Sequence, residues 1–600
     1  MKKCYLTNFW SWSNIPRRGG KLSFDNSHKM AQLPYFFYPK SSSTKIQNPA
    51  RRKIMRNCTS IERMSKAEIL KVIIETLKLV PYYFRGQKPP FLDEQADYWR
   101  SAKLGLLFQE SSSRTLGSFG EAFTWLMGRL GIPMTAESSS LKKNETLLRS
   151  VITLIQQGCS AVCLRTKIEG AAEFLAQQLY QLDGSLGWFK TSVPILNGGD
   201  GTRNHPTQIL LDMVTIVLRQ IGVRRMNEED LVNLDQFLKD KTDEELSAFI
   251  SEVFNQLTIA FVGDLRFSRV VSSWLDIGRK FTVSYILVAP SIFQVEDWQL
   301  AGLNAAKSEK LADARQANIT YVLRGQVERL KQFMPEAAAR EVLSQLSVDE
   351  RYLDGYSGEL MHAQPLDSET PMIDPSIWHH PQCTMDMQAA MGPPTRAITF
   401  HLCSLGREEE VNLFTVPAVA SATLLEEPIA VHQAKPAEKW AQTQRSINPL
   451  NRGTVIDHLL PGTGQVLDRL LQLAGIYGSD GSDGVVVPRK PSGEDRKRRK
   501  DIIFLDDRFV ANEVLAALGL FAPDMRVIIL DDGKYCKVKV DLPSAVASIL
   551  KCPNADCVTR VAPEAKSFFT VDGSSPNGPH LNCGFCRGRF TKFQIFEQLR

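Results

Sequence analysis

The sequence predicts an α/β fold of two lobes, followed by a separate globular unit and a short cysteine-rich tail. Between about residues 64 and 400, apolar runs of strand length alternate with segments of helical periodicity, which is typical of parallel sheets covered by helices. The expected strands end in polar or glycine residues, and open α/β sheets bind ligands beyond these carboxyl ends. Two such series in succession predict two lobes with a cleft between them.

The first series begins with a helix that we expect to start at Ser65, a residue type that caps helices. A second long amphipathic helix is expected over 207–222, at the end of the sequence HPTQ. The strands expected between these helices are KLGLLF (103–108), PMTAES (133–138), SAVCLR (160–165) and VPILNGG (193–199).

The second series supplies four more expected strands, which are LTIAFVGD (257–264), TVSYILVAP (282–290), NITYVLRGQ (318–326) and GELMHAQP (358–365). Before it lies a charged insert, residues 223–257, which we expect to form two short helices on the solvated surface and not a site. Periodicity fades over 405–445, which predicts a linker. A new globular unit follows from residue 446, interrupted by a basic loop over 489–500.

Charge and cysteine content narrow the class of protein. The first 60 residues hold twelve Lys and Arg and one acidic residue, Asp25, whereas the whole chain has a net charge of +6. This segment has no periodicity and precedes no nucleic-acid-reading module, so we expect a disordered or transit-like extension, or sequence upstream of the true start. No run approaches 18 apolar residues, and seven of eleven cysteines are scattered, mostly in apolar surroundings. These features predict a cytoplasmic protein without a membrane span.

The stretch FQESSSRTLGSFGE (108–121) is the first candidate site. It places three serines, Arg114 and Thr115 between an expected strand and an expected helix. Backbone N–H groups at a helix start favour an anion, hydroxyls add donors, and an arginine offers a bidentate fork. Taken alone, the same stretch could be a plain serine-rich helix cap.

Two further stretches of the first lobe carry cations and a histidine. The loop SSSLKKNET (138–146) could bring a lysine to an anion, although a solvated loop is the simpler interpretation. In NGGDGTRNHPTQ (197–208), the proline after His205 fixes a turn, where the imidazole could polarise a carbonyl while Gln208 grips an amino group. Arg165 is the last residue of the expected strand 160–165 and places a cation at the carboxyl end of that strand.

The second lobe places arginines directly past two strands, in GDLRFSR (263–269) and YVLRGQVER (321–329). Arg269 and Arg324 could converge on the cleft, with Gln326 two residues further on. Two arginines in one cleft suit a substrate with two carboxylates, whereas either arginine alone could be an ordinary surface charge.

In this order and spacing, SSSRT, the lysine loop, HPTQ, R-x-Q and the later MHAQP resemble the aspartate carbamoyltransferase family over about residues 64–400. The resemblance implies the two-lobed carbamoyltransferase fold, with a carbamoyl-phosphate-binding domain over 61–205 and an aspartate-binding domain over 206–404. It also implies the reaction of carbamoyl phosphate with L-aspartate to give N-carbamoyl-L-aspartate and phosphate, an early committed step of pyrimidine (UMP) synthesis.

The resemblance implies a role for each site residue. It assigns carbamoyl-phosphate binding to Ser112, Ser113, Arg114, Thr115, Ser139, Lys143, Arg165, His205, Gln208 and Gln364. It assigns aspartate binding to Lys143, Arg269, Arg324 and Gln326. It assigns backbone contacts with the carbamoyl group to Gln364 and Pro365. The catalytic groups that it implies are Arg114, Thr115, Lys143, His205 and Gln208.

In the family, the residues that Ser139 and Lys143 match come from a neighbouring subunit. The resemblance therefore implies a homo-oligomer built on catalytic trimers with shared active sites. Glu110 resembles the acid that pairs with Arg269 and Arg329 when the lobes close. Catalysis would then rest on positioning and electrostatics, with no metal and no covalent intermediate.

The sequence departs from the family pattern at a few positions. Ser113 replaces the usual threonine, and Leu366 stands where an arginine is usual. Ala363 and Gln364 replace a Pro-Leu pair, and the lysine loop lacks its usual glycine. Because the hydroxyl and the backbone carbonyls are retained, we expect activity with an altered affinity for aspartate.

The remaining four cysteines are bunched near the C-terminus. Cys552 and Cys557 are spaced C-x4-C, and Cys583 and Cys586 are spaced C-x2-C. Paired thiolates at such spacing supply the four soft ligands of structural Zn²⁺, one ion per chain. Four unrelated thiols and a nucleic-acid-binding zinc ribbon are the alternatives.

The surrounding residues NRGTVIDHLLPG, KDIIFLDD, KVDLP and CPNADC resemble the regulatory chain of class-B bacterial aspartate carbamoyltransferase. This resemblance implies an α+β nucleotide-binding regulatory domain over 446–545 and a small zinc-binding β domain over 546–600. It also implies allosteric effectors among CTP, ATP and UTP. The residues that match the effector positions are Val455, Asp457, His458 and Lys537. Phe504 stands where an important lysine is usual, so we expect weaker binding of triphosphates.

The sequence therefore favours an aspartate carbamoyltransferase with a fused regulatory module. One alternative is a carbamoyltransferase for ornithine or another amine, which the R-x-Q motif and the regulatory tail disfavour. Another is a catalytically silent nucleotide-binding scaffold, which the intact Arg114, His205, Gln208 and Arg324 disfavour. We expect neither nucleic acid nor a membrane as a partner.

Overall fold

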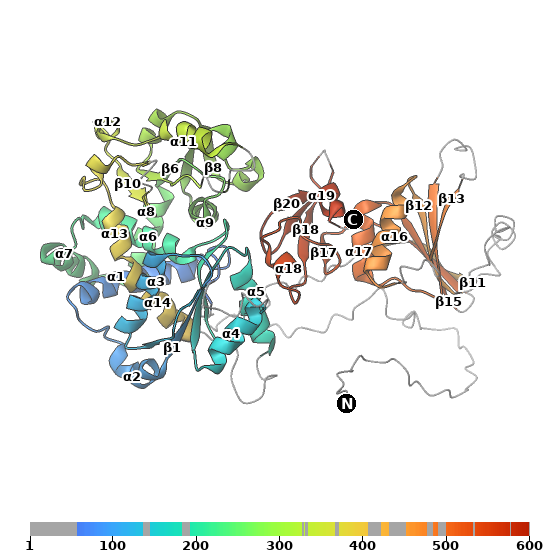
Figure 1. Ribbon diagram of the computed structural model, residues 1–600, viewed down its shortest axis with the longest axis horizontal. Helices are drawn as coiled ribbons and strands as arrows, with labels where there is room; N and C mark the ends of the chain where they lie inside the picture. Colours follow the sequence, from blue (N-terminus) through green and yellow to red (C-terminus); the bar gives the residue numbers. More distant parts are fainter. Residues whose placement is uncertain are drawn as a thin grey trace. The chain divides into compact units, whose positions relative to one another are not determined.

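The computed structural model describes residues 57–135, 145–182, 193–326, 329, 334–366, 371–405, 422–430, 452–476, 484–489, 500–531, 534–575 and 578–598. These residues form two parallel sheets followed by two antiparallel sheets (Figure 1). The predicted sequence of two α/β lobes, an α+β domain and a small β domain is confirmed. Of the basic extension expected over 1–60, residues 1–56 lie outside the described residues.

The first sheet is parallel and has the strand order β2, β1, β4 and β5, with β3 pairing β1 further along the same edge. Its strands are β1 (Lys103–Phe108), β2 (Arg129–Leu130), β3 (Met134–Thr135), β4 (Ala161–Thr166) and β5 (Ile195–Asp200). The helices of this lobe are α1 (Lys66–Phe84), α2 (Leu92–Ser101), α3 (Ser113–Trp125), α4 (Leu147–Gln156), α5 (Ala171–Leu182) and α6 (Pro206–Ile221).

Local sequence explains where the two long helices begin. Ser65 caps α1, because its hydroxyl accepts the N–H of Glu68 while the Glu68 carboxylate accepts the N–H of Ser65. Helix α6 starts at Pro206, whose fixed φ suits the first helical position, and ends at Gly222 with φ 97°. Both helices bury apolar residues in the main core and pack against each other.

The second sheet is also parallel, with the order β10, β9, β6, β7 and β8. Its strands are β6 (Thr258–Val262), β7 (Ser284–Val288), β8 (Asn304–Ser308), β9 (Ile319–Val322) and β10 (Glu359–His362). Its helices are α9 (Arg269–Gly278), α11 (Glu336–Ser344), α12 (Glu350–Leu353) and α13 (Met385–Ala390), with short 3-10 turns at Ser291–Phe293, Asp297–Leu300, Leu311–Gln316 and Pro375–Ile377. Strand β8 was not predicted, because it is a mostly exposed edge strand without an apolar run.

The chain returns to the first lobe through α14 (Gly392–Leu405), which packs against α1 and α3. Phe400 of α14 makes edge-to-face contacts with Phe119 and Phe123 of α3, at ring-centre distances of 5.8 and 5.1 Å. Together with α6, which contacts both α1 and α9, this helix connects the two lobes through packed side chains.

The charged insert forms α7 (Glu228–Lys239) and α8 (Asp243–Asn255), so the prediction of two helices is confirmed. The insert is more than a solvated addition, because it buries Leu234, Leu246, Ile250 and Phe254 in the main core. Asp243 also pairs with Lys78 of α1 at 2.6 Å. The insert therefore packs on α1 and α6, and Phe254 also contacts the rings of Trp274 and Phe281 in the second lobe.

The third sheet is antiparallel, in the order β11, β16, β15, β12, β14 and β13, with two helices on one face (Figure 1). Its elements are β11 (Ala422–Ala430), β12 (Gly453–Leu459), α16 (Thr463–Leu473), β13 (Gly484–Arg489), β14 (Lys500–Asp506), α17 (Asn512–Phe521), β15 (Arg526–Asp531) and β16 (Lys534–Val540). Strand β11 lies inside the segment expected to be a linker, 405–445. That prediction rested on the fading of periodicity into Glu, Pro and Ala, which does not reveal a strand added at the edge of a sheet.

The last sheet joins β17 (Ala545–Ala547), β18 (Phe568–Asp572), β19 (His580–Cys583) and β20 (Arg589–Thr591), with the short helices α18 (Val558–Val561) and α19 (Lys592–Glu597) beside it. Among the helices of the described residues, none is both long enough and apolar enough to cross a bilayer.

We predict that Phe254→Ala destabilises the two lobes by about 3–5 kcal/mol, because it empties a fully buried aromatic site in α8. Differential scanning calorimetry should show the transition of the catalytic lobes moving down by several degrees. Val232→Ala in α7, a position with 40% exposure, is the matched control and should change the transition little. Equal small shifts for both variants would contradict a structural role of the insert.

Candidate active site

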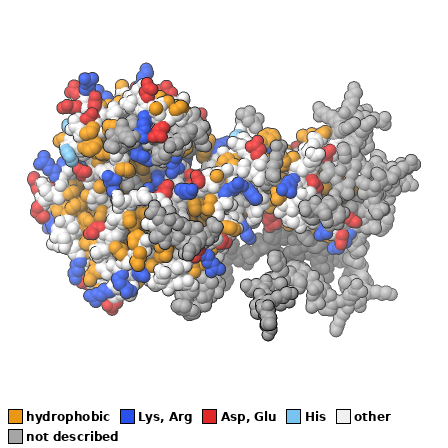
Figure 2. Space-filling view, in the orientation of Figure 1, with side chains coloured by type: hydrophobic (Ala, Val, Ile, Leu, Met, Phe, Trp, Pro, Cys, Tyr) orange, Lys and Arg blue, Asp and Glu red, His pale blue; other side chains and the backbone are white. Residues whose placement is uncertain are grey.

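A cavity of about 770 Å³ lies between the two lobes, at the carboxyl ends of strands from both sheets. Figure 2 shows a recess with blue side chains (Lys or Arg) between two parts of the surface, and the cations among the described residues that line the cavity are arginines. The predicted site residues that line the cavity are Ser112, Ser113, Arg114, Thr115, Arg165, His205, Gln208, Arg269, Arg324, Gln326, Gln364 and Pro365. Residues that lie far apart in the sequence thus meet in one cleft.

The serine-rich stretch serves both as a helix cap and as part of the cavity wall. Ser112 is the N-cap of α3, since its hydroxyl accepts the N–H of Thr115 and donates to the Thr115 hydroxyl at 2.9 Å. The side chains of Ser113 and Arg114 stay exposed to the cavity. The first turn of α3 therefore offers backbone N–H groups, hydroxyls and a guanidinium to an anion.

Arg165 and Arg269 approach each other around Gly199, which has φ 123°. A Cβ at this position would lie 2.3 Å from Nη1 of Arg269 and 2.8 Å from Nη1 of Arg165, so only glycine fits. Burial, followed by the charge of Arg269, lowers the pKa of Arg165 to about 9. Nε of Arg165 and Nη1 of Arg269 have no hydrogen-bond partner among the described residues. Two partly buried cations with open donors are a strong attractor for an anion.

Glu110 connects this pair to the second lobe. Its carboxylate lies 3.2 Å from Nη2 of Arg269 and 3.7 Å from Nη2 of Arg329. The acid that follows β1 thus bridges to two arginines of the other lobe, the pairing that the family resemblance implies. This contact holds the lobes together across the cavity.

His205 precedes α6 and is buried, with its backbone N–H donated to the hydroxyl of Ser273. Its pKa lies well below 6.5, because burial and then the charges of Arg165, Arg396 and Arg269 oppose protonation. The imidazole is therefore neutral at physiological pH and offers one N–H donor. A neutral donor beside several cations suits the polarisation of a carbonyl oxygen.

The second lobe contributes a turn and a polar strand end to the opposite wall. His362 accepts the backbone N–H of Gln364 at 2.8 Å, which fixes the turn before Pro365. Burial, and then the nearby charges of Arg114 and Arg324, lower the pKa of His362 to about 4. Arg114 of the first lobe and Arg324 of the second therefore line the cavity together with this imidazole.

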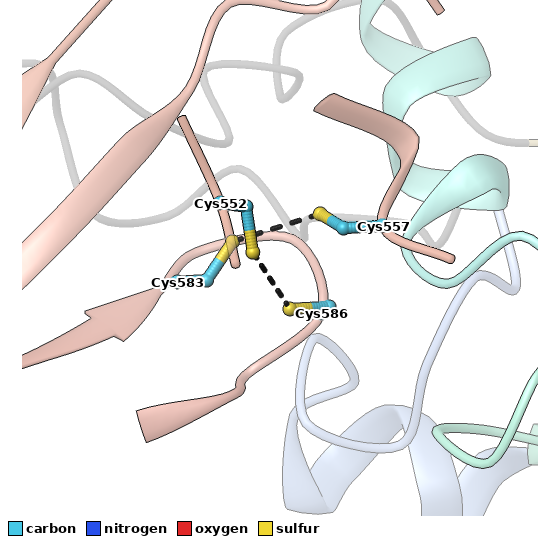
Figure 3. Close-up of side chains that lie close together, drawn as sticks. All are labelled: Cys552, Cys557, Cys583 and Cys586. Atoms are coloured by element: carbon cyan, nitrogen blue, oxygen red, sulfur yellow. Dashed lines mark hydrogen bonds between the residues drawn. The ribbon is translucent and has the colours of Figure 1, made fainter. Parts of the chain in front are cut away.

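Four cysteine thiols converge at the start of the last domain (Figure 3). Their sulfur atoms lie within 4.8 Å of one another and all four residues are buried. The Cys552–Cys586 and Cys557–Cys583 sulfur distances are 3.6 and 3.8 Å. Four ligands at about 2.3 Å from one tetrahedral Zn²⁺ would be separated by about 3.8 Å, so the donor set and its geometry fit this ion.

The chain matches three family models. Residues 56–217 match the aspartate/ornithine carbamoyltransferase carbamoyl-phosphate-binding domain. Residues 445–541 match the allosteric domain of the aspartate carbamoyltransferase regulatory chain, and residues 544–596 match its metal-binding domain.

Relatives of the catalytic part are curated as aspartate carbamoyltransferase catalytic subunits. The protein of Corynebacterium efficiens is 30% identical over 282 residues, which cover 46% of this chain and 74% of the relative. The protein of Methanococcoides burtonii is 30% identical over 308 residues, which cover 50% of this chain and 84% of the relative. The chain belongs to the aspartate carbamoyltransferase family.

Solved structures of the family are also similar to the catalytic part. The catalytic subunit of aspartate transcarbamoylase from M. jannaschii is 25% identical, covers 59% of this chain and 100% of its own, and has a TM-score of 0.44. The enzyme of Trypanosoma cruzi, in complex with carbamoyl aspartate and phosphate, is 24% identical, covers 58% and 96%, and has a TM-score of 0.44. In this chain, the catalytic and regulatory parts of the family are fused.

The metal-binding domain contacts both lobes of the catalytic part. The backbone of Glu169, after β4, pairs with the backbone of the Cys552–Cys557 loop, and its carboxylate accepts Asn554 Nδ2 at 2.7 Å. Arg587, next to Cys586, donates to Asp276 of α9 at 2.6 Å and also to Glu62 of the first lobe. The cysteine loops are thus built into the interface with the catalytic part.

The regulatory sheet shows where the predicted effector residues lie. Lys537, Ile528, Val455 and Phe504 form one row across four neighbouring strands, because each is the direct partner of the next. Paired residues of antiparallel strands point to the same face, so Phe504 lies beside Val455 on the face that carries Lys537. Asp457 and His458 lie further along β12, and Asp457 is held by Lys500 at 2.7 Å.

Some site residues escaped the sequence analysis, and two predicted ones cannot be placed. Ser139 and Lys143 fall in 136–144, outside the described residues. Arg396 of α14 and Gln388 of α13 line the cavity but were not predicted. Both lie on helices and not at the end of a strand, where the sequence predicts site residues. They reach the cavity only because the chain folds back to the first lobe.

We predict that Gly199→Ala lowers kcat/KM by about 100-fold, because the new methyl group displaces both Arg165 and Arg269. Steady-state kinetics and the affinity for inorganic phosphate measure this loss. Gly158→Ala is the matched control, since Gly158 also has a positive φ, 86°, but no atom within 4 Å of its added Cβ. Equal losses in both variants would show that backbone strain, and not displaced arginines, causes the effect.

Proposed function

We propose that this chain transfers the carbamoyl group of carbamoyl phosphate to the α-amino group of L-aspartate, an early step of pyrimidine synthesis. The observation that carries the proposal is the cavity in which Arg114 and Arg165 of the first lobe face Arg269 and Arg324 of the second. Membership of the family gives the reaction class. Cations on both sides of one space suit a phosphate on one side and a dicarboxylate on the other.

In the proposed mechanism, the α3 turn and Arg165 bind the phosphate group. Arg114, Thr115 and the neutral His205 donate to the carbamoyl oxygen as it gains negative charge. The aspartate nitrogen forms a bond to the carbamoyl carbon, and the carbon–oxygen bond to phosphate then breaks. The proton of the amine leaves with the departing phosphate, so no protein group needs to change its protonation state.

The remaining assignments follow from the family resemblance. We assign the aspartate carboxylates to Arg269 and Arg324, with Gln326 beside them. Gln326 is itself positioned, since its backbone N–H donates to Asp264 at 3.0 Å and its side chain to the carbonyl of Phe267 at 2.5 Å. Ser139 and Lys143 would complete the site from a neighbouring subunit of a trimer.

We further propose that the four-cysteine cluster holds one structural Zn²⁺ and that the metal-binding domain docks on the catalytic part. The effector residues Val455, Asp457, His458 and Lys537 would bind a nucleotide such as CTP, ATP or UTP. Phe504 supplies no cation in this row, so triphosphates should bind weakly. The free cysteines among the described residues support a cytoplasmic location.

The function is tested by offering the purified chain carbamoyl phosphate with L-aspartate or L-ornithine. We expect carbamoyl-aspartate to form, and Arg324→Ala to raise the KM for aspartate by about 10- to 100-fold while changing the KM for carbamoyl phosphate little. Arg266→Ala is the matched control, because Arg266 lies on a neighbouring loop outside the cavity wall. Preferential carbamoylation of ornithine, or folded oligomeric protein without turnover of aspartate, would refute the proposal.

We expect mass spectrometry to find about one zinc per chain, and we expect the variant Cys583→Ser to lose this zinc. Since metal binding contributes folding free energy, the same variant should melt the last domain at lower temperature. Cys383→Ser is the control, because Cys383 is a free, partly buried thiol outside the cluster. A chain that folds normally and contains no zinc would show that the four thiols are unrelated.

A further inference from the structure

A buried carboxylate lies directly behind the cavity. Asp212 follows Gln208 by one turn of α6 and is fully buried. Its Oδ1 accepts the side-chain amides of Gln208 at 2.9 Å and Gln388 at 2.8 Å. Its Oδ2 accepts the hydroxyl of Tyr321 at 2.9 Å and the indole N–H of Trp274 at 3.4 Å. Four donors from four helices and strands thus converge on one acid.

The carboxylate determines which way the Gln208 amide points. Oδ1 of Asp212 can only accept, so the NH₂ group of Gln208 must face it. Gln208 lines the cavity, and its carbonyl oxygen is then the group left to accept a hydrogen bond there. An acceptor at this position selects a ligand with an N–H group and disfavours one with a methyl group.

The same carboxylate also supports the opposite wall. Gln388 is oriented at both ends, because its NH₂ faces Asp212 and its carbonyl oxygen accepts the backbone N–H of His362 at 3.0 Å. His362 in turn accepts the N–H of Gln364 at 2.8 Å. One chain of hydrogen bonds therefore runs from Asp212 through Gln388 and His362 to the turn that carries the Gln364 carbonyl.

We propose that Asp212 is a positioning residue that orients both acceptors for the carbamoyl NH₂, the Gln208 side chain and the turn at Gln364. This inference deepens the proposed function and rests on it. It gives the site its discrimination between a carbamoyl group and an acyl group of the same size. Asp212 contacts neither substrate and acts only through the groups that it holds.

The arrangement survives a change in the protonation of Asp212. Burial raises the pKa of Asp212 to about 7, against the opposing effect of its hydrogen bonds. If Oδ2 carries a proton, it can donate to the oxygen of Tyr321, while Oδ1 still accepts both amides. An asparagine can reproduce most of the protonated form, with Oδ1 as the acceptor and Nδ2 as the donor to Tyr321, and it loses only the long hydrogen bond from Trp274, at 3.4 Å. A leucine of similar shape can do neither.

This difference between asparagine and leucine gives the test. The probes are carbamoyl phosphate, acetyl phosphate, which has a methyl group in place of NH₂, and inorganic phosphate, each titrated into the full-length chain. The ratio of the acetyl phosphate Kd to the carbamoyl phosphate Kd measures selection of the NH₂ group. Phosphate affinity reports on the α3 turn and Arg165, which Asp212 does not touch.

We expect Asp212→Leu to lower this ratio by at least about tenfold, because both acceptors lose their orientation, with phosphate affinity unchanged within about twofold. Asp212→Asn should keep the ratio within about threefold of the wild type. A merely structural role would weaken all three ligands together. An unchanged ratio in Asp212→Leu, or an equal loss for all three ligands, would overturn the proposal.

Gln388→Met provides a second route if Asp212→Leu does not fold. It cuts the link to His362 and Gln364 but leaves Gln208 bonded to Asp212. The ratio should therefore fall by about threefold, to a value between those of wild type and Asp212→Leu. No change in the ratio would overturn the proposal. Because these readouts are binding constants, they are separate from turnover of aspartate. Wild-type protein that selects carbamoyl phosphate but carbamoylates no aspartate would refute the proposed function alone.

Discussion

The structure depends on the accumulation of positive charge in a partly buried cleft. Arg165, Arg269 and Arg396 surround His205 closely enough to lower its pKa, and burial lowers the pKa of Arg165 as well. Charges of one sign repel more strongly when water is removed from between them. The arginines of the cleft therefore repel one another, and an anion bound between them would relieve that repulsion.

Several other features exist to hold these charges in place. Glu110 is shared by two arginines of the second lobe, so one acid both offsets charge and joins the lobes. Gly199 leaves the space that Arg165 and Arg269 occupy. The packing of α6, α14 and the insert helices supplies the apolar contacts that hold the two lobes together. The histidine stays neutral because burial, and then the charges around it, lower its pKa.

Sequence patterns predicted the parts of this arrangement that depend on local structure. The apolar runs that became β1, β4, β5, β6 and β9 end where polar residues begin, and this edge of each sheet carries the predicted site residues. The network behind the cleft could not be predicted in this way. Asp212, Tyr321 and Gln388 lie within apolar helices or strands, and only the tertiary packing brings their polar atoms together. The buried role of the insert was missed because a charged helix face says little about what covers its other face.

Ion pairs connect the metal-binding domain to the same group of charges. Arg587, beside the cysteine cluster, binds Asp276 on α9, the helix that begins at Arg269. It also binds Glu62, whose pKa falls to about 2 because Arg587, Arg203 and Arg63 outweigh the effect of burial.

Arg203 continues this connection into the catalytic part. It is nearly fully buried, pairs with Glu173 at 2.8 Å, and lies 3.7 Å from Glu62 and from Asp200, the last residue of β5. Removing one member of a buried charge network leaves the others uncompensated, which costs more than the loss of an exposed pair. The contacts of the metal-binding domain and the placement of two cavity-lining residues, Arg269 and His205, therefore share one set of charges.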